Sequence, residues 1–302
     1  MKTILIATDF SDHAQLAADT AIALARRHEA NLVCVHATIM SEAEPTLFET
    51  AHGKLEEFRQ HVQNQLGQRR AWLKMLSDRA DNAGVRSQHH LVDGSPADAI
   101  CAAADEVQAD LVVMGSHGHT GFKRILLGSV AERVVRLCKS SVLIARGQRI
   151  DENGFRRIVV PTDFSASADT ALERAVHLAA VDATVDILHC WQVLGYAEGP
   201  LDPSAGPAII HTTIAEHVAK DAEKRGRVLV ERASGGERTV CFHVHRGRPT
   251  AGIQSFLDEQ AQPCDLLAVG THGRTGLSRL LLGSVAETTV RYSPCSVLVA
   301  RS

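Results

Sequence analysis

The sequence predicts two tandem α/β domains, each built on a five-stranded parallel sheet with helices on both faces. In each half, short apolar runs of strand length alternate with helical segments, and continuous apolar strands are typical of parallel sheets. Residues 114–146 and 269–301 also align without a gap and are identical at 20 of 33 positions. A period of roughly 154 residues exceeds solenoid repeats and matches a whole domain. We therefore expect domains over 1–147 and 155–302.

The first half begins with a strand at 4–7, after which Ser11 and Asp12 offer N-caps for a helix to about Arg27. Apolar residues from Leu55 to Leu76 recur at helical spacing, which indicates a long helix over 53–82. Further strands are expected at 32–37, 85–92, 110–114 and 142–145, and helices at 96–108 and 129–139. The second half repeats this order, with strands near 157–161, 184–189, 239–245, 265–269 and 296–300, after a polar linker at 147–154.

Composition argues against several classes of protein. The formal net charge of −3 gives no reason to expect a nucleic-acid or membrane partner. No apolar run suits a transmembrane helix, and the early first strand leaves no room for a signal peptide, so a cytoplasmic protein is expected. Seven cysteines without a CxxC pair favour reduced thiols over disulfides or zinc. His243 and His245 alternate as two ligands on one strand face would, but the sequence shows no ligand set around them, so no metal is predicted.

Two repeated motifs fall at the carboxyl ends of the expected strands, where open parallel sheets bind their ligands. Asp9 and Asp163 end the first strand of each half. A glycine motif follows the fourth strand, as Gly115-x2-Gly118-x9-Gly128-Ser129 and as Gly270-x2-Gly273-x9-Gly283-Ser284.

The glycine motif suits a polyphosphate. Glycine at a strand exit permits a positive φ and close approach of a ligand to the backbone. The last glycine and the serine open a helix, whose N-terminal N–H groups and dipole favour an anion. The alternative is structural, because Ser129–Glu132 and Ser284–Glu287 also fit capping boxes that need no ligand. Since glycines, serine and aspartate recur together in both halves, we favour phosphate binding.

The strand-end carboxylates of Asp9 and Asp163 suit hydrogen bonds from ribose hydroxyls or an adenine amino group. The alternative is that they cap the following helices. His117 and His272, inside the glycine loop, are interpreted as loop-ordering residues, because no partnered nucleophile is visible. The motif is neither a P-loop nor a dinucleotide fingerprint. Cations in the nine-residue spacer could screen phosphate charge: Lys123, Arg124, Arg274 and Arg279.

The strand ending in Asp-Phe-Ser and the G-2x-G-9x-G-[S/T] motif closely resemble the universal stress protein family, in its tandem form with two domains in one chain. The resemblance covers nearly the whole sequence. It implies a Rossmann-like fold of the adenine nucleotide hydrolase type and, for members with this motif, ATP binding. It also implies an internal pseudo-dimer through the fifth strands, Val142–Ala145 and Val297–Ala300, and further homodimerisation.

Carried over residue by residue, the resemblance implies a nucleotide site in each half. The strand-end aspartates would contact ribose and adenine, Ala37 and Cys190 would line the adenine pocket, and the glycines with their serines would hold the phosphates. Pro161 matches the family's Pro-Thr-Asp opening where the first half has Ala7, so the second domain is the favoured ATP site. The implied site residues are Asp9, Ala37, Gly115, Gly118, Gly128, Ser129, Val130, Pro161, Asp163, Cys190, Gly270, Gly273, Gly283, Ser284 and Val285.

We therefore expect a stress-response or regulatory protein that binds ATP together with Mg²⁺. The sequence shows no evident base, arginine finger or metal-binding carboxylate set, so ATP hydrolysis would at most be slow and no fast enzyme is expected. Two alternatives stay open. One is a nucleotide-independent interaction module whose glycine motifs are structural, and the other is a true enzyme of the related adenine nucleotide hydrolase folds.

Overall fold

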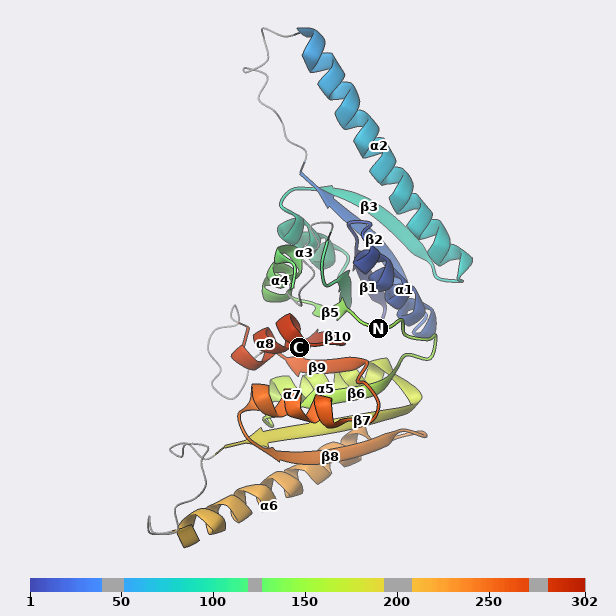
Figure 1. Cartoon of the computed structure of the whole chain (residues 1–302). Coiled ribbons are helices and arrows are strands. Elements are labelled where there is room, and N and C mark those ends of the chain that lie inside the picture. The colour runs from blue at the N-terminus through green and yellow to red at the C-terminus, as the bar shows by residue number, and fades with distance from the viewer. Residues whose placement is uncertain (40–51, 119–126, 193–207, 272–281, 302) are drawn as a thin grey trace. The chain divides into compact units, whose positions relative to one another are not determined.

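The computed structural model describes residues 1–39, 52–118, 127–192, 208–271 and 282–301. The chain divides into two compact units, Met1–Gly154 and Phe155–Ser302, in which strands and helices follow one another in the same order (Figure 1). The predicted α/β class is confirmed in both units. Within the described ranges, no helix is both long and apolar enough to cross a membrane.

The first unit has a parallel sheet in the strand order β3-β2-β1-β4-β5. The predicted strands and helices of this half are all present, with ends shifted by no more than two residues. In chain order they are β1 (Thr3–Ala7), α1 (Asp12–Arg27), β2 (Asn31–Thr38), α2 (His52–Asn82), β3 (Ser87–Asp93), α3 (Pro96–Glu106), β4 (Leu111–Gly115), α4 (Ser129–Leu137) and β5 (Ser141–Ala145).

The second unit repeats this sheet in the order β8-β7-β6-β9-β10. One prediction was wrong in extent, because β7 begins directly after α5 rather than near residue 184. The early part of β7 is alanine-rich and pairs with β6 through a register shift, a pattern without strand periodicity. The elements are β6 (Phe155–Pro161), α5 (Ala166–Leu178), β7 (Ala179–Trp191), α6 (Ala208–Ala233), β8 (Thr239–Arg246), α7 (Pro249–Glu259), β9 (Leu266–Gly270), α8 (Ser284–Tyr292) and β10 (Ser296–Ala300).

Helices cover both faces of each sheet, as predicted. In the first unit, α1 and α2 pack on one face, and α3 and α4 pack together on the other (Figure 1). In the second unit, α5 and α6 correspond to the first pair, and α7 and α8 to the second. The central strands are buried along most of their length. This layering leaves the carboxyl ends of the strands as the place where loops from several elements converge.

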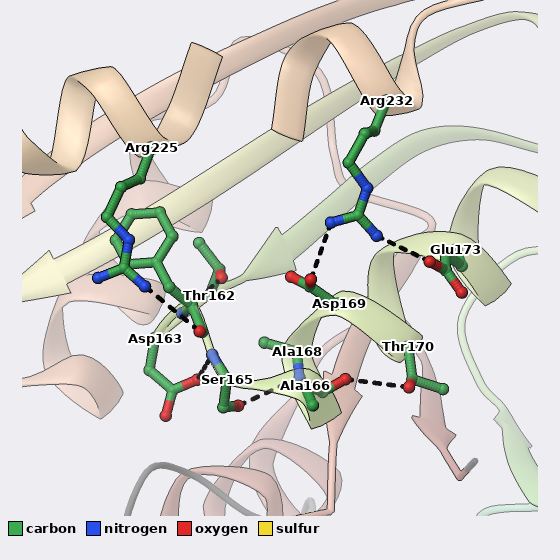
Figure 2. Close-up of polar contacts among 11 residues, drawn as sticks. Thr162, Asp163, Ser165, Ala166, Ala168, Asp169, Thr170, Glu173, Arg225 and Arg232 are labelled. Atoms are coloured by element: carbon green, nitrogen blue, oxygen red, sulfur yellow. Dashed lines mark hydrogen bonds and ion pairs between the residues drawn. The ribbon is translucent and has the colours of Figure 1, made fainter. Parts of the chain in front are cut away.

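In each unit, one arginine of the long helix forms an ion pair with the first helix. The sequence alone did not predict this repeated contact. Arg79 of α2 lies 3.3 Å from Asp19 of α1. In the second unit, Arg232 of α6 contacts Asp169 and Glu173 of α5 at 2.8 and 2.7 Å (Figure 2). Both contacts place the long helix beside the helix that follows the strand-end aspartate.

Candidate functional site

A tight turn after β6 presents Asp163 at the carboxyl end of the sheet. Phe164 has a left-handed conformation with a φ of 61°, and its N–H donates to Thr162 Oγ1 at 2.9 Å. The Ser165 N–H donates to Asp163 Oδ1 at 3.0 Å. Ser165 Oγ in turn accepts from the Ala168 N–H, as the N-cap of α5 (Figure 2). The Asp163 carboxylate is therefore oriented by its own turn.

The first unit repeats this turn around Asp9. Asp9 Oδ1 accepts from the Ser11 N–H at 3.1 Å and from the Ser11 hydroxyl at 2.6 Å. Ser11 caps α1, and the intervening Phe10 has a φ of 67°. The alternative in which the aspartates cap the helices is therefore wrong. Positive φ at a bulky residue is strained, and such strain is characteristic of functional sites.

A histidine on the second strand of each unit supports the strained phenylalanine. The Nδ1 atoms of His36 and His189 lie 2.7 and 2.8 Å from the Thr8 and Thr162 carbonyl oxygens, so Nδ1 carries the proton. The ring of His36 lies 4.8 Å from that of Phe10 between centroids, and the second unit repeats this contact at 4.6 Å. These histidines directly precede Ala37 and Cys190 in sequence. Their contact with the phenylalanines could not be predicted from the sequence, because it depends on the left-handed conformation of the turn.

The long helices contact the two phenylalanines with different side chains. In the first unit, the Trp72 ring lies 5.1 Å from the Phe10 ring. In the second, the Arg225 guanidinium lies 4.1 Å from the Phe164 ring centroid, a cation–π contact. Arg225 Nη2 also donates to the Phe164 carbonyl oxygen at 3.4 Å (Figure 2). The second site thus has a fixed positive charge next to its aspartate turn.

The first glycine of each motif is required by helix packing. A Cβ on Gly115 would lie 2.8 Å from the backbone carbon of His13 in α1. A Cβ on Gly270 would lie 2.3 Å from Ser167 Oγ and 2.6 Å from the Ser167 backbone. Neither glycine has a positive φ, nor do Gly118, Gly128 and Gly283, so the predicted reason of a left-handed conformation was wrong for them. Close approach of a ligand to these glycines stays a prediction, because the group that approaches Gly115 and Gly270 here is the protein's own helix.

The second glycine of the first motif meets the strand-end aspartate. A Cβ on Gly118 would lie 2.3 Å from Asp9 Oδ2, so the bare backbone brings the glycine loop against the carboxylate. This contact joins two motifs that lie more than a hundred residues apart in sequence. Several residues of the predicted sites fall outside the described residues: Gly273, His272, Lys123, Arg124, Arg274 and Arg279.

The third glycine of each motif is the N-cap of the helix that follows. The Gly128 N–H donates to the Ser116 carbonyl oxygen at 2.9 Å, and the Gly283 N–H donates to that of Thr271 at 2.8 Å, which closes each glycine loop at its base. Ser129 and Ser284 are the first helical residues rather than the caps. The predicted capping boxes are therefore wrong, because the N-cap positions hold glycines without side chains.

A cavity of about 260 Å³ in the second unit lies between the aspartate turn and the start of α8. Leu188, Ile253 and Val269 contribute apolar surface, while Asp163 and Ser284 contribute polar groups. Burial raises the pKa of the Cys190 thiol to about 11, so at neutral pH it is a small uncharged side chain. The cavity brings together residues that sequence analysis assigned to the second site: Pro161, Asp163, Cys190, Gly270, Gly283, Ser284 and Val285.

A wider cavity of about 680 Å³ adjoins the first and shares Asp163 and Cys190 with it. Phe164, His189 and Arg225 line it from the turn, the sheet and α6. In the first unit, Ala37 and Val130 are half-buried and Ser129 is exposed, as are their counterparts Cys190, Val285 and Ser284. The two adjoining cavities of the second unit extend from the aspartate turn to the N-terminus of α8, and their dimensions suit a small ligand.

His117 in the first glycine loop predicts a pH dependence of stability. Burial, then the positive charges of His13 and Arg146, lower the pKa of His117 from its usual 6.5. The unfolded chain therefore binds more protons than the folded chain as pH falls through about 6.5, so the folded state loses stability there. We expect the free energy of unfolding, measured by urea denaturation, to fall less between about pH 7.5 and about pH 5.5 in His117→Gln than in the wild-type chain. Identical pH profiles for the two proteins would contradict this assignment.

Comparisons with known proteins agree with the fold. A model of the universal stress protein family matches residues 1–146 and again 154–301. A universal stress protein of Methanocaldococcus jannaschii is 37% identical over 145 residues, covering 48% of this chain and 82% of that protein. One of Mycobacterium tuberculosis is 31% identical over 205 residues, covering 64% of this chain and 62% of its own length, which is less than two thirds. The crystal structure of a universal stress protein from Archaeoglobus fulgidus has a TM-score of 0.62 at 20% identity, covering 99% of this chain and 98% of that one, which shows a shared fold.

Proposed function

The chain belongs to the universal stress protein family as a tandem, two-domain member, and from that premise we propose that it binds ATP with Mg²⁺ and acts as a stress-response or regulatory factor. The nucleotide site of the proposal is the second domain. We propose that the protein acts in the cytoplasm. Pairing of the two halves through their fifth strands and formation of a homodimer stay predictions.

The cavity of the second domain is the observation that carries this proposal. Its apolar side, at Leu188, Ile253 and Val269, suits the adenine ring. Asp163 lies at the junction of the two adjoining cavities, where its carboxylate can accept hydrogen bonds from ribose hydroxyls. The first turn of α8, which begins at Ser284, offers backbone N–H groups to phosphate oxygens, and Ser284 also offers its hydroxyl.

Two features of the same site support a nucleotide rather than an uncharged ligand. The N-terminal dipole of α8 favours negative charge at the cavity mouth. Arg225, held against Phe164, adds a cation beside the adjoining cavity. Mg²⁺ would be carried by the phosphates themselves, as is usual for this ion. With no base assigned next to the phosphate position, we propose binding with at most slow hydrolysis.

A comparison of ATP with adenosine tests the proposal. If the start of α8 holds phosphates, Mg-ATP should bind the purified full chain at least ~tenfold more tightly than adenosine, because charge-assisted hydrogen bonds are lost without phosphates. Isothermal calorimetry measures both affinities. Equal affinities would contradict the phosphate assignment, and binding of neither would favour the interaction module whose glycine motifs are structural.

A further inference from the structure

A second cluster of chemically active side chains lies on the sheet of the second domain, among residues that do not line the cavity. Asp186 of β7 and Cys241 and His243 of β8 place a carboxylate oxygen, a sulfur and a ring nitrogen within 4.8 Å of one another. We propose that these three residues form a binding site for a transition-metal dication of the Zn²⁺ type. The proposal is independent of the ATP site and stands if that assignment fails.

The register of the two strands creates the cluster. Asp186 pairs with Cys241, and His243 follows two residues later on the same face of the sheet. His243 Nε2 lies 2.8 Å from Asp186 Oδ1. In the sequence, His243 and His245 show no further ligands around them. The strand pairing reveals two: the Asp186 carboxylate reaches His243 from the neighbouring strand β7, and Cys241 lies two residues before His243 on the same face of β8.

The duplicated domain supplies an internal comparison. Ile4 and Ile158 occupy the same place in the repeated strand motif, and their β2 and β7 partners are Leu32 and Val185. The residue after Val185 is Asp186, whereas the residue after Leu32 is Val33. Gln88 and His90 occupy the positions of the other two ligands in the first unit. The ligand set is therefore specific to the second domain.

Asp186 places a buried carboxylate where the first unit has Val33, and the cost of burying its charge must be offset by nearby partners. Asp186 and Val33 are both only 5% exposed, and a charge buried without partners is strongly unfavourable. Arg157 Nη2 lies 3.6 Å from Asp186 Oδ2, too far for a hydrogen bond, and donates to Gln260 Oε1 at 3.2 Å. Arg157 thus restrains one side of the carboxylate while Oδ1 faces His243. A dication between Oδ1 and the two strand ligands would complete the compensation.

The donor set and its accessibility fit zinc chemistry. Nitrogen, thiolate sulfur and carboxylate oxygen are the ligands that Zn²⁺ takes in proteins, and a three-ligand site leaves one position for water. The Phe256 ring of α7 packs 4.8 Å from the His243 ring and fixes its orientation. The His243 side chain is 38% exposed, which gives the ion access from solvent. On binding, the Cys241 thiol releases its proton, and the proton on the His243 ring resides on Nδ1.

Titration of the purified full chain with Co²⁺ tests the site, because Co²⁺ replaces Zn²⁺ in such sites and absorbs light when a thiolate is bound. We expect one Co²⁺ to bind per chain and to give a thiolate-to-cobalt charge-transfer band. Cys241→Ser should remove that band, and His243→Ala should weaken binding at least ~tenfold. Two variants are controls that should leave the band unchanged: Cys264→Ser, whose sulfur lies 3.6 Å from that of Cys295, and Asp163→Ala in the ATP site.

Zn²⁺-dependent thermal stability gives a second readout. The wild-type chain and the Cys264→Ser variant should gain melting temperature on adding Zn²⁺, whereas His243→Ala should not. Far-UV circular dichroism establishes that each variant is folded. The proposal is overturned if the wild-type chain gives no charge-transfer band at stoichiometric Co²⁺, if the band survives in Cys241→Ser, or if it disappears in Cys264→Ser instead.

Discussion

Replacing Asp163 with alanine is expected to weaken ATP binding by the second domain roughly tenfold to a hundredfold. The carboxylate is held by its turn at the junction of the two cavities, where it would accept hydrogen bonds from the ribose. Hydrogen bonds to a charged group contribute more than neutral ones, so their loss should dominate over the change in cavity size. Calorimetric titration with Mg-ATP measures the affinity.

Two further variants separate recognition from turn stability. Asp163→Asn keeps an oxygen that can accept from the Ser165 N–H, so it should preserve the turn and still weaken ATP binding. Asp169→Ala is the matched control, because Asp169 lies on the same helix-turn unit but contacts Arg232 of α6. Asp163→Ala that remains folded and binds ATP as tightly as the wild-type chain would show that the nucleotide does not use this carboxylate.

Gly270→Ala is expected to destabilise the second domain by about 2–3 kcal/mol. The added Cβ would lie 2.6 Å from the Ser167 backbone at the start of α5, where backbone atoms cannot move as a side chain can. Relief would require α5 to shift away from β9, against which it packs. Urea unfolding followed by circular dichroism measures the loss, with the transition of the second domain moving to lower urea.

Gly67→Ala is the matched control for this prediction. Gly67 lies within α2, and a Cβ there meets nothing within 4 Å. Because alanine favours helix more than glycine by about 1 kcal/mol, this variant should be as stable as the wild-type chain or more so. A Gly270→Ala chain that unfolds at the wild-type urea concentration would mean that α5 adjusts freely, and that this glycine serves a purpose other than packing.

The sequence predicted the order of elements well, because that order follows from local patterns. Apolar runs and helical periodicity placed β1 to β5 within two residues, and the repeated motifs marked the carboxyl ends of the strands. The alanine-rich start of β7 carried no such pattern, so its extent was missed.

The reasons behind individual motif residues were harder to predict, because they depend on contacts between distant segments. Gly115 and Gly270 accommodate the helix after the first strand, which no spacing rule in the motif indicates. The left-handed Phe10 and Phe164 and their histidine supports appear only once the strands are paired. The contact of Asp186 with His243 likewise joins residues 57 positions apart in the chain.

Native mass spectrometry of the full chain with Mg-ATP tests the central claim most directly. The account predicts at least one bound ATP in the wild-type chain, held by the second domain. That ATP should remain in Gly118→Ala, which brings a Cβ against Asp9 in the first domain, and should be lost in Asp163→Ala. A wild-type chain that binds no ATP at millimolar concentration, or an ATP that is lost in Gly118→Ala and retained in Asp163→Ala, would contradict it.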